Sequence, residues 1–409
     1  MKALSAALLA ALLGGCTRAR PVASRPALPR SSERLGATAP PTTALVALPE
    51  PFATPSAQRP AVLVPRPAGA SLRPAQGFTV RPWARGLLGA RHLARSPDGR
   101  LFATDSRRGR LLLVEPGSAE PTVFASGLGL PFGVAFLPEA WVLVACTDAV
   151  VRLRYRPGQR AADGPAERVV TLPGHGYHQH WTRTLALSTD HGTLFVSVGS
   201  ETDADVEPDP RRGAVSACDV SSWRCRVFAG GLRNAVGMAL EPARGALFAA
   251  VNERDGLGDD LPPDYLTEVR EGAFYGWPYA YFGPHPDPRH GGERPDLVAS
   301  TVTPDLSLGA HSAPVAVLFP TEGPLRGDAV VSLHGSWNRA QLVGYKVVRV
   351  RLQGGRPTGA VEDLLTGWLL PDGRAWGRPA GLAALPGGAL LVLDDGTGEV
   401  WALEAVTAP

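Results

Sequence analysis

The sequence has almost no segment in which apolar residues recur with the 3.6-residue period of an amphipathic helix. Charged residues make up 19% of the 409 positions, whereas Gly and Pro contribute 47 and 40 residues. This composition suits a soluble, turn-rich β protein better than a helical one. The length allows two average domains or one large all-β or barrel domain, and it does not choose between them.

Lysine is nearly absent, since Lys2 and Lys346 are the only two and almost every cation is Arg. The formal net charge is +3, but residues 1–60 carry seven basic and two acidic side chains, which is +5 and leaves 3 − 5 = −2 for the rest. A slightly acidic body with basic residues confined to its tail gives no electrostatic case for nucleic-acid binding.

No hydrophobic run is long enough for a permanent membrane-spanning helix, because the one at the N-terminus, "MKALSAALLAALLGGCTRAR", has about a dozen apolar residues. Its "LGGC" is typical of a bacterial lipobox and predicts cleavage before Cys16 and lipidation of that sulfur. The alternative is a plain secretory signal. We expect a protein of the bacterial cell envelope that touches the membrane only through its lipid anchor and faces the periplasm, or a secreted one.

Cysteine is scarce, with four residues, but export makes disulfides possible. Cys218 and Cys225 lie in "ACDVSSWRCRV", two short alternating runs around a turn, so they can face each other across a hairpin and form a bridge. The alternative is two free buried thiols. Cys146, in "WVLVACTD", is then left over as a buried core thiol.

Residues 17–74 are rich in Pro, Ala, Arg and Ser and cannot bury enough apolar surface to fold alone. We therefore expect a signal peptide over residues 1–16, a disordered tether over 17–74, and a globular body over 75–409.

The body repeats one pattern six times: a polar or aromatic entrance, a strand, a turn, and a second strand that ends in polar residues. The second strands are expected to begin near Leu101, Trp141, Leu194, Leu247, Ala329 and Leu390. Repeats of short strands at spacings of about 40 to 80 residues predict an all-β fold, a six-bladed β-propeller. A sandwich would not repeat an entrance motif six times.

In a propeller the innermost strands line a central channel, so equivalent entrance positions converge around one axis. The aligned positions are Arg91, Phe132, His180, Arg233, His311 and Arg378. Like charges in a ring are costly unless an anion lies among them, so the ring predicts an acidic ligand. The alternative is a wet channel in which each Arg pairs with a local carboxylate.

From about residue 75 to the end, the chain resembles the quinoprotein sugar dehydrogenases of the soluble glucose dehydrogenase and sorbosone dehydrogenase type, and the sorbosone branch more closely. The motifs that carry the resemblance are "HWTRTLALSTDHGTLFVSVGS", "GLRNAVGMAL", "VNERDGLGDDLPPDYLTEVREGAFYGWPYAYFG", "HGSWNRAQLVGYKVVRVRL" and "GRPAGLAALPGGALLVLDD". The resemblance implies a six-bladed propeller that uses pyrroloquinoline quinone (PQQ) and Ca²⁺. PQQ is a tricarboxylate, which would account for a cationic ring.

The resemblance also implies roles for individual residues. His180 falls on the general base, which takes the hydroxyl proton of the sugar. Arg233 would lie beside the reactive quinone oxygens, and Asn234 would hydrogen-bond the cofactor. Arg378 would pair with a cofactor carboxylate as a planar bidentate donor. Arg91 and His311 are further candidate cofactor contacts because they share the ring.

Calcium in such proteins is held partly by main-chain carbonyls of the loop that is "NERDGLGDD" here. The candidate metal residues are Asn252, Glu253, Arg254 and Asp255, with Asp259 and Asp260 as side-chain helpers. The alternative for this acidic loop is a solvated turn.

The chain departs from the soluble glucose dehydrogenases at two positions. Ser200 stands where they orient the base with an Asp, so Glu201 or another acid must take over that role, or it is left undone. His334 stands where they have a cofactor-pairing Lys, with Arg339 close behind as a further candidate contact. In the entrance segment "GYHQHWTRTLAL", Trp181 is expected to be a wall and Arg183 structural, while His178 has no assigned role.

The leading hypothesis is a PQQ-dependent dehydrogenase that oxidises a sugar, an aldose or a related aldehyde and passes electrons to a periplasmic acceptor, a quinone or a cytochrome. A calcium-dependent lactonase on the same fold would need carboxylates at the entrances, where this chain has Arg and His. A binding or scaffold lipoprotein that has lost its cofactor is the third alternative.

Overall fold

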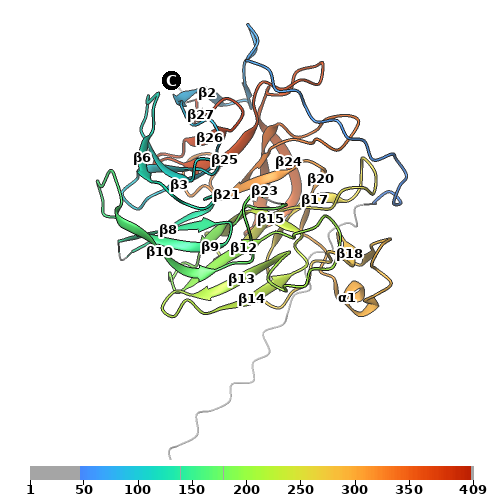
Figure 1. The fold of residues 1–409 in the computed structure, drawn as a ribbon. Coiled ribbons are helices and arrows are strands. Elements are labelled where there is room, and N and C mark those ends of the chain that lie inside the picture. Colours follow the sequence, from blue (N-terminus) through green and yellow to red (C-terminus); the bar gives the residue numbers. More distant parts are fainter. Residues whose placement is uncertain (1–46, 139, 178, 407–409) are drawn as a thin grey trace, which may run out of the picture. The chain divides into compact units, whose positions relative to one another are not determined.

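A computed structural model describes residues 47–138, 140–177 and 179–406 of the chain. Within these ranges six antiparallel sheets of four or five strands surround one axis, so the predicted six-bladed β-propeller is confirmed (Figure 1). The α-helix α1 (Pro295–Ser300) is short and lies in an insertion of the fourth blade. In the same ranges no helix is long and apolar enough to span a membrane.

The first three blades each take four consecutive strands of the chain. Blade 1 contains β3 (Ala90–Arg95), β4 (Leu101–Asp105), β5 (Arg110–Val114) and β6 (Thr122–Ala125). Blade 2 contains β7 (Val134–Leu137), β8 (Trp141–Cys146), β9 (Ala149–Arg154) and β10 (Asp163–Thr171). Blade 3 contains β11 (Leu185–Leu187), β12 (Thr193–Val198), β13 (Ala214–Asp219) and β14 (Cys225–Gly230).

The last three blades contain the insertion and the ring closure. Blade 4 contains β15 (Asn234–Glu241), β16 (Ala246–Asn252), β17 (Pro263–Glu268) and β20 (Leu306–Ala310), with the small hairpin of β18 (Ala280–Tyr281) and β19 (His285–Pro286) inserted. Blade 5 contains β21 (Pro314–Leu318), β22 (Ala329–Leu333), β23 (Lys346–Gln353), β24 (Arg356–Thr366) and β1 (Arg73–Pro74). Blade 6 contains β25 (Pro379–Ala384), β26 (Leu390–Asp394), β27 (Glu399–Ala405) and the early strand β2 (Phe78–Ala84), whose pairing with β27 closes the ring.

Apolar clusters fill the gaps between neighbouring blades, and one cluster joins the last blade to the first. The second strands are therefore buried on both faces, which explains why they are continuous apolar runs and not alternating ones. All five residues of β22 and of β26 are buried. The predicted starts of the second strands agree with the structure to within one residue in all six blades.

The repeat alignment also places the channel correctly. His180 lies a few residues before β11, Arg233 directly before β15, and Arg378 directly before β25, which are innermost strands of their blades. Each aligned position therefore lies at the same end of its inner strand or just before it. The inner strands thus bring their entrance residues together at one end of the axis.

The segment before residue 75 differs from the expected tether. Residues 47–74 contact the propeller: Val64 N–H donates to Ala375 O at 2.9 Å, and β1 pairs with β24. The Arg66 guanidinium lies 5.1 Å from the Trp376 ring centroid. Pro-rich composition predicted that this stretch cannot fold alone, but the propeller supplies the apolar surface that it lacks. The signal peptide, the lipidation site Cys16 and the beginning of the tether lie outside the described residues.

The predicted disulfide between Cys218 and Cys225 is present, and the two residues are directly opposite each other in the β13 and β14 ladder. Cys146 is a free, buried thiol, as expected. Because the bridge closes a loop with a sequence separation of 7, replacing both cysteines by Ala should lower the free energy of unfolding by about 2 kcal/mol. Urea denaturation measures this, with Cys146→Ala as the control for loss of a thiol. An unchanged midpoint in the double variant would contradict the prediction.

Candidate active site

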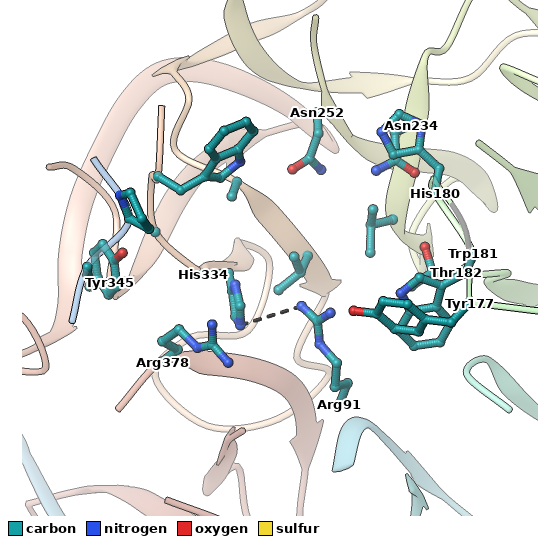
Figure 2. A pocket seen from close by; sticks show the side chains of 17 residues that line it. Arg91, Tyr177, His180, Trp181, Thr182, Asn234, Asn252, His334, Tyr345 and Arg378 are labelled. Carbon is teal, nitrogen blue, oxygen red and sulfur yellow. Dashed lines mark hydrogen bonds between the residues drawn. The ribbon is translucent and has the colours of Figure 1, made fainter. Parts of the chain in front are cut away.

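A cavity of about 500 Å³ lies at the end of the channel where the inner strands begin (Figure 2). Its charged, amide and hydroxyl lining residues are Arg91, His180, Thr182, Asn234, Asn252, His334 and Arg378. Its aromatic lining residues are Tyr177, Trp181, Trp337 and Tyr345. Among the lining residues that the structure describes there is no Asp or Glu. The cavity wall is thus basic and neutral, which suits an acidic ligand.

One side of the cavity carries the basic group of Arg91, Arg378 and His334, which all contact Asp395. Arg91 Nε and Arg378 Nε lie 3.2 Å and 3.0 Å from the carboxylate, and His334 Nε2 lies 3.0 Å from it. Burial acts to raise the pKa of Asp395, but His334, Arg91 and Arg378 outweigh it and lower that pKa. Two guanidinium groups thus share one carboxylate, which leaves net positive charge facing the cavity.

His334 contributes an uncharged ring to this group. Burial, opposed by Asp395, lowers the pKa of His334 to about 4. Its Nε2 also lies 3.4 Å from Arg91 Nη2 (Figure 2). Near neutral pH the imidazole therefore donates a hydrogen bond to Asp395 and adds no charge of its own.

His180 lies opposite, on a tight turn held by Arg183. The Arg183 guanidinium donates to the carbonyl oxygens of His180, Thr182 and Pro173 at 2.6 Å, 2.8 Å and 2.7 Å. Arg183 is 1% exposed, so its role is structural, as predicted. His180 itself has φ +47°, a left-handed conformation that His tolerates better than most residues. Gly199 lies against this turn, where a Cβ would meet His180 Cβ at 2.6 Å.

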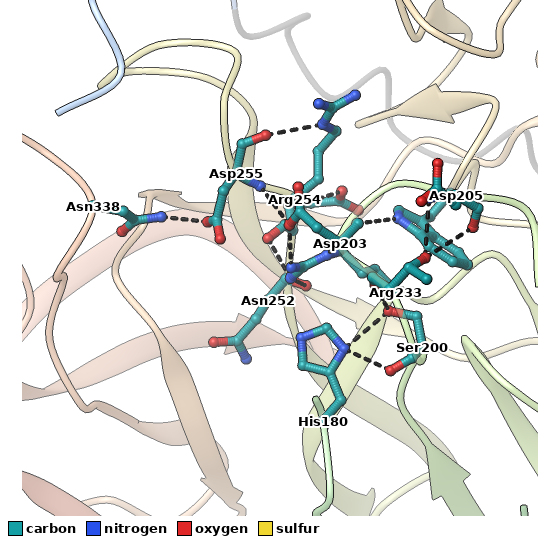
Figure 3. A network of polar contacts seen from close by, with 12 residues as sticks. His180, Ser200, Asp203, Asp205, Arg233, Asn252, Arg254, Asp255 and Asn338 are labelled. Atoms are coloured by element: carbon teal, nitrogen blue, oxygen red, sulfur yellow. Dashed lines mark hydrogen bonds and ion pairs between the residues drawn. The ribbon is translucent and has the colours of Figure 1, made fainter. Parts of the chain in front are cut away.

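Ser200 orients the His180 ring (Figure 3). His180 Nδ1 lies 2.9 Å from the Ser200 carbonyl oxygen and 2.9 Å from Ser200 Oγ. Ser200 Oγ uses its own proton to donate to Thr202 O at 2.6 Å, so both Ser200 oxygens act as acceptors toward the ring. Nδ1 must then carry the proton, which leaves Nε2 as the basic nitrogen.

Glu201, a candidate for orienting the base, forms an ion pair with Arg212, whereas Ser200 contacts His180 Nδ1. Burial, followed by the charge of Arg233, lowers the pKa of His180 well below its usual value. His180 is therefore neutral at physiological pH and ready to accept a proton. The residue beside Nδ1 is thus an uncharged serine and not the expected acid. Ser200 adds no negative charge that would raise the pKa of His180.

Arg233 is buried in a polar network of its own and does not line the cavity (Figure 3). Its Nη2 lies 2.6 Å from Asp203 Oδ1, and its Nε donates to Asp203 O at 2.9 Å. Its Nη1 donates to the carbonyl oxygens of Glu253 and Asn252 at 2.6 Å and 3.3 Å. Arg233 thus pairs with a local carboxylate, which was the alternative to a ring of cations around an acidic ligand.

His311 and Arg339, two further candidate cofactor contacts, also lie outside the cavity lining. His311 Nε2 donates to Gly258 O at 2.9 Å, while its Nδ1 accepts from Asn338 Nδ2 at 2.8 Å. Arg339 Nη2 donates to Asp260 Oδ1 at 2.8 Å. Both side chains join the loops of blades 4 and 5.

The candidate metal residues fall into two groups. Asp259 accepts from the backbone N–H groups of Ala57 and Ala340, and Asp260 pairs with Arg339, so both carboxylates hold neighbouring chain segments. Asn252 and Glu253 present the carbonyl oxygens that Arg233 binds.

The other two members of the metal loop are also engaged by neighbours. Arg254 forms an ion pair with Asp287 at 2.7 Å, and Asp255 accepts from Asn338. Across the part of the chain that the structure describes, no cluster of three or more His, Cys, Asp or Glu side chains is placed to hold a metal ion. Any cation at this loop would therefore depend on main-chain oxygens.

Several cavity residues were missed in the sequence. Tyr177, Tyr345, Pro60 and Ala61 line the cavity, and Asp395 holds its basic group. A signal existed for Asp395, which stands in the polar end of the sixth second strand, "LLVLDD". No sequence signal pointed to Pro60 and Ala61, since they lie in the Pro-rich stretch. His178 lies outside the described residues.

The fold and the site define a six-bladed propeller with a basic axial cavity and a neutral, oriented histidine. Residues 72–264 and 296–406 match the TrAA12-like family, and the chain belongs to it. The PQQ-dependent pyranose dehydrogenase of Coprinopsis cinerea is 26% identical over 407 residues, which cover 82% of this chain and 55% of that protein. The chain thus spans little more than half the length of this relative.

Solved structures share this fold. The holo PQQ domain of pyranose dehydrogenase from Coprinopsis cinerea has a TM-score of 0.70 and 25% identity, covering 83% of this chain and 98% of that chain. A family AA12 carbohydrate-active enzyme from Trichoderma reesei, in an iodide structure, has a TM-score of 0.72 and 23% identity, covering 82% and 98%. The resemblance to quinoprotein sugar dehydrogenases is confirmed, whereas the sorbosone branch stays a prediction.

Proposed function

We propose that this protein is a PQQ-dependent dehydrogenase that oxidises a sugar. The observation that carries the proposal is the pairing of a neutral His180, with Nε2 as its basic nitrogen, and a basic group of Arg91 and Arg378 in one cavity. The Coprinopsis cinerea relative named above is a PQQ-dependent pyranose dehydrogenase, which supports this proposal. A pyranose or other aldose is the substrate class that we favour.

The residues of the cavity fit PQQ. Arg91 and Arg378 share the single carboxylate of Asp395, so they have donor capacity and charge left for the acid groups of a tricarboxylate. Arg91 Nε has no hydrogen-bond partner among the described atoms, and its contact with Asp395 is an ion pair only. Asn234 and Asn252 would supply amide hydrogen bonds. Bound PQQ would supply the acceptor for the hydride of the sugar.

Calcium would be held beside the cavity through main-chain oxygens, since Asn252 lines the cavity and Glu253 does not. The carbonyl groups of Asn252 and Glu253 are the oxygen donors that would hold the ion. They accept hydrogen bonds from Arg233 in the structure, so binding of the ion competes with those bonds.

In the proposed reaction His180 acts as the base, and neighbouring residues form the wall of the cavity around it. His180 Nε2 would take the hydroxyl proton of the sugar, because Nδ1 already donates to Ser200. Trp181, 8% exposed, forms the wall behind the base and meets Phe132 edge to face at 5.9 Å between ring centroids.

Reconstitution tests the proposal. PQQ and Ca²⁺ are added to purified protein, the quinone absorbance is recorded, and dye reduction is measured with a panel of sugars. We expect a bound quinone and sugar-dependent dye reduction. The absence of bound quinone would overturn the proposal, and bound quinone without turnover on any sugar would favour a scaffold protein. The lactonase alternative lacks support, because no carboxylate is among the described lining residues.

Replacing Arg378 by Gln should weaken PQQ binding by about ten- to a hundredfold. A hydrogen bond to a charged group contributes about 1.5–3 kcal/mol, and the Gln amide keeps a donor but no charge. Titration of the quinone absorbance measures the effect. Arg374→Gln serves as the matched control, since Arg374 pairs with the exposed Asp372 away from the cavity. Equal affinities of the two variants would argue against Arg378 as a cofactor contact.

We further propose that the protein is exported as a lipoprotein anchored at Cys16 and passes its electrons to a periplasmic acceptor, a quinone or a cytochrome. The lipobox-like "LGGC" supports the anchor. Labelling with a radioactive fatty acid tests it, and a Cys16→Ser variant should lose the label.

A further inference from the structure

Residues 52–66 form a segment, which we name the strap, that crosses loops of three blades beside the cavity. It starts on the loop of blade 4 that follows β16. Phe52 N–H donates to Leu257 O at 2.7 Å, and Asp259 N–H donates to Thr54 Oγ1 at 2.9 Å. Gly258 N–H donates to Ser56 Oγ at 3.0 Å. The first part of the strap is thus fixed by backbone N–H and carbonyl groups of one loop.

The strap then passes over blades 5 and 6. Arg59 N–H donates to Trp337 O at 2.7 Å, and its Nη1 donates to Ala340 O at 2.8 Å. Ala375 N–H donates to Val62 O at 3.0 Å, which fixes the far end on blade 6. Hydrogen bonds on both sides make the strap a fixed wall and not a loose tail.

Between these two anchors the strap faces the cavity. Pro60 and Ala61 line it together with His180, Asn234 and Arg378. Pro60 has no N–H to donate, because its nitrogen is part of the pyrrolidine ring. This side of the cavity therefore offers the carbon surface of Pro60 and Ala61, next to the rings of Trp337 and Tyr345.

The opposite side of the cavity is open. A second cavity of about 530 Å³ shares Arg91, Tyr177 and Trp181 with the first and continues past Arg107. Leu63 of the strap lies at its border. Tyr177 is 61% exposed there, so a ligand too large for the first cavity has room on the blade 1 side.

We propose that the strap is the specificity-determining wall of the sugar site. The basic group binds the cofactor, and the apolar strap and its neighbouring rings limit the size of the sugar ring that reaches His180. Aromatic and apolar surface suits the C–H faces of a pyranose. Substituents of a larger sugar are directed past Tyr177. The inference rests on the proposed function and assigns a role to a stretch that the sequence presents as a linker.

Added bulk on the strap tests the proposal. Pro60→Trp and Ala61→Leu place larger side chains at the two cavity positions, and Gln58→Trp places the same bulk on an exposed strap residue outside the cavity. We expect both cavity variants to raise KM at least tenfold for a hexose, and less for a pentose, at unchanged quinone binding. Gln58→Trp should keep the wild-type KM. Because Ala61 packs partly against the core, Pro60→Trp, at an exposed position, keeps the test valid if Ala61→Leu fails to fold.

The outcomes separate the two proposals. Folded Pro60→Trp protein that binds quinone and keeps wild-type KM values for both sugars overturns the role of the strap alone. Wild-type protein without bound quinone overturns the proposed function and the strap proposal with it. An equal rise of KM in Gln58→Trp would show that any disturbance of the strap structure has the same effect, whether or not the residue faces the cavity. This result would also overturn the proposal.

Discussion

His180→Asn is expected to keep bound PQQ and to lose activity, with kcat reduced by about 10² to 10⁴-fold. The reason is that Nε2 of His180 is the basic nitrogen in the cavity, whereas the Asn amide is no base. Asn is preferred over Ala because residue 180 has φ +47°, a region that Asn tolerates well. Stopped-flow reduction of the bound quinone by sugar measures the step directly.

A matched control exists for this variant. His191 also has a positive φ, +59°, and lies exposed on the blade 3 hairpin, away from the cavity. His191→Asn should reduce the quinone at the wild-type rate. His180→Asn protein that binds quinone and retains the wild-type rate would show that another group is the base.

Ser200→Asp is expected to move the acid limb of the pH profile to higher pH by about 1 to 3 units. In the wild type, burial and then Arg233 lower the pKa of His180, so the base stays neutral and active well below pH 6.5. A carboxylate beside Nδ1 favours the imidazolium and raises that pKa. Since the base acts in its neutral form, activity is then lost at a higher pH as the solution is acidified. The pH dependence of kcat/KM measures the pKa in the free enzyme.

The control for this substitution is Ser200→Asn, which has nearly the same shape as Asp and no charge. Ser200 is fully buried, so both variants need a thermal unfolding measurement to show that they fold. An acid limb of Ser200→Asp that coincides with that of Ser200→Asn would mean that the group titrating in the profile is not His180.

Much of the fold was predictable from the sequence because the blade repeat is local. Each blade is made mostly of consecutive strands, and its turn and its buried second strand are separated by few residues, so the pattern is visible in the chain. The same holds for Cys218 and Cys225, which are seven residues apart on one hairpin. The convergence of Arg91, His180 and Arg378 followed from the repeat, because equivalent positions of a propeller surround one axis.

The direction of each side chain was not predictable in this way, because it depends on partners from distant parts of the chain. Arg233 turns toward Asp203, 30 residues before it, and His311 toward Gly258, 53 residues before it. Both sit at ring positions, yet neither lines the cavity. A buried guanidinium needs its donors satisfied, and the oxygens that satisfy those of Arg233 come from a loop of the preceding repeat and from the far end of its own repeat.

The sequence by itself determined the class of fold, the number and order of blades, and the histidine that stands at the channel end. The tertiary structure decided that Ser200 and not an acid orients that histidine, that Asp395 gathers the basic group, and that Asp259 holds Ala57, 202 residues away, instead of serving as a free ligand. The physical reason is that a repeated sequence pattern indicates which surfaces must be buried. The hydrogen-bond partners of buried polar groups, in contrast, are determined only when distant segments of the chain come together.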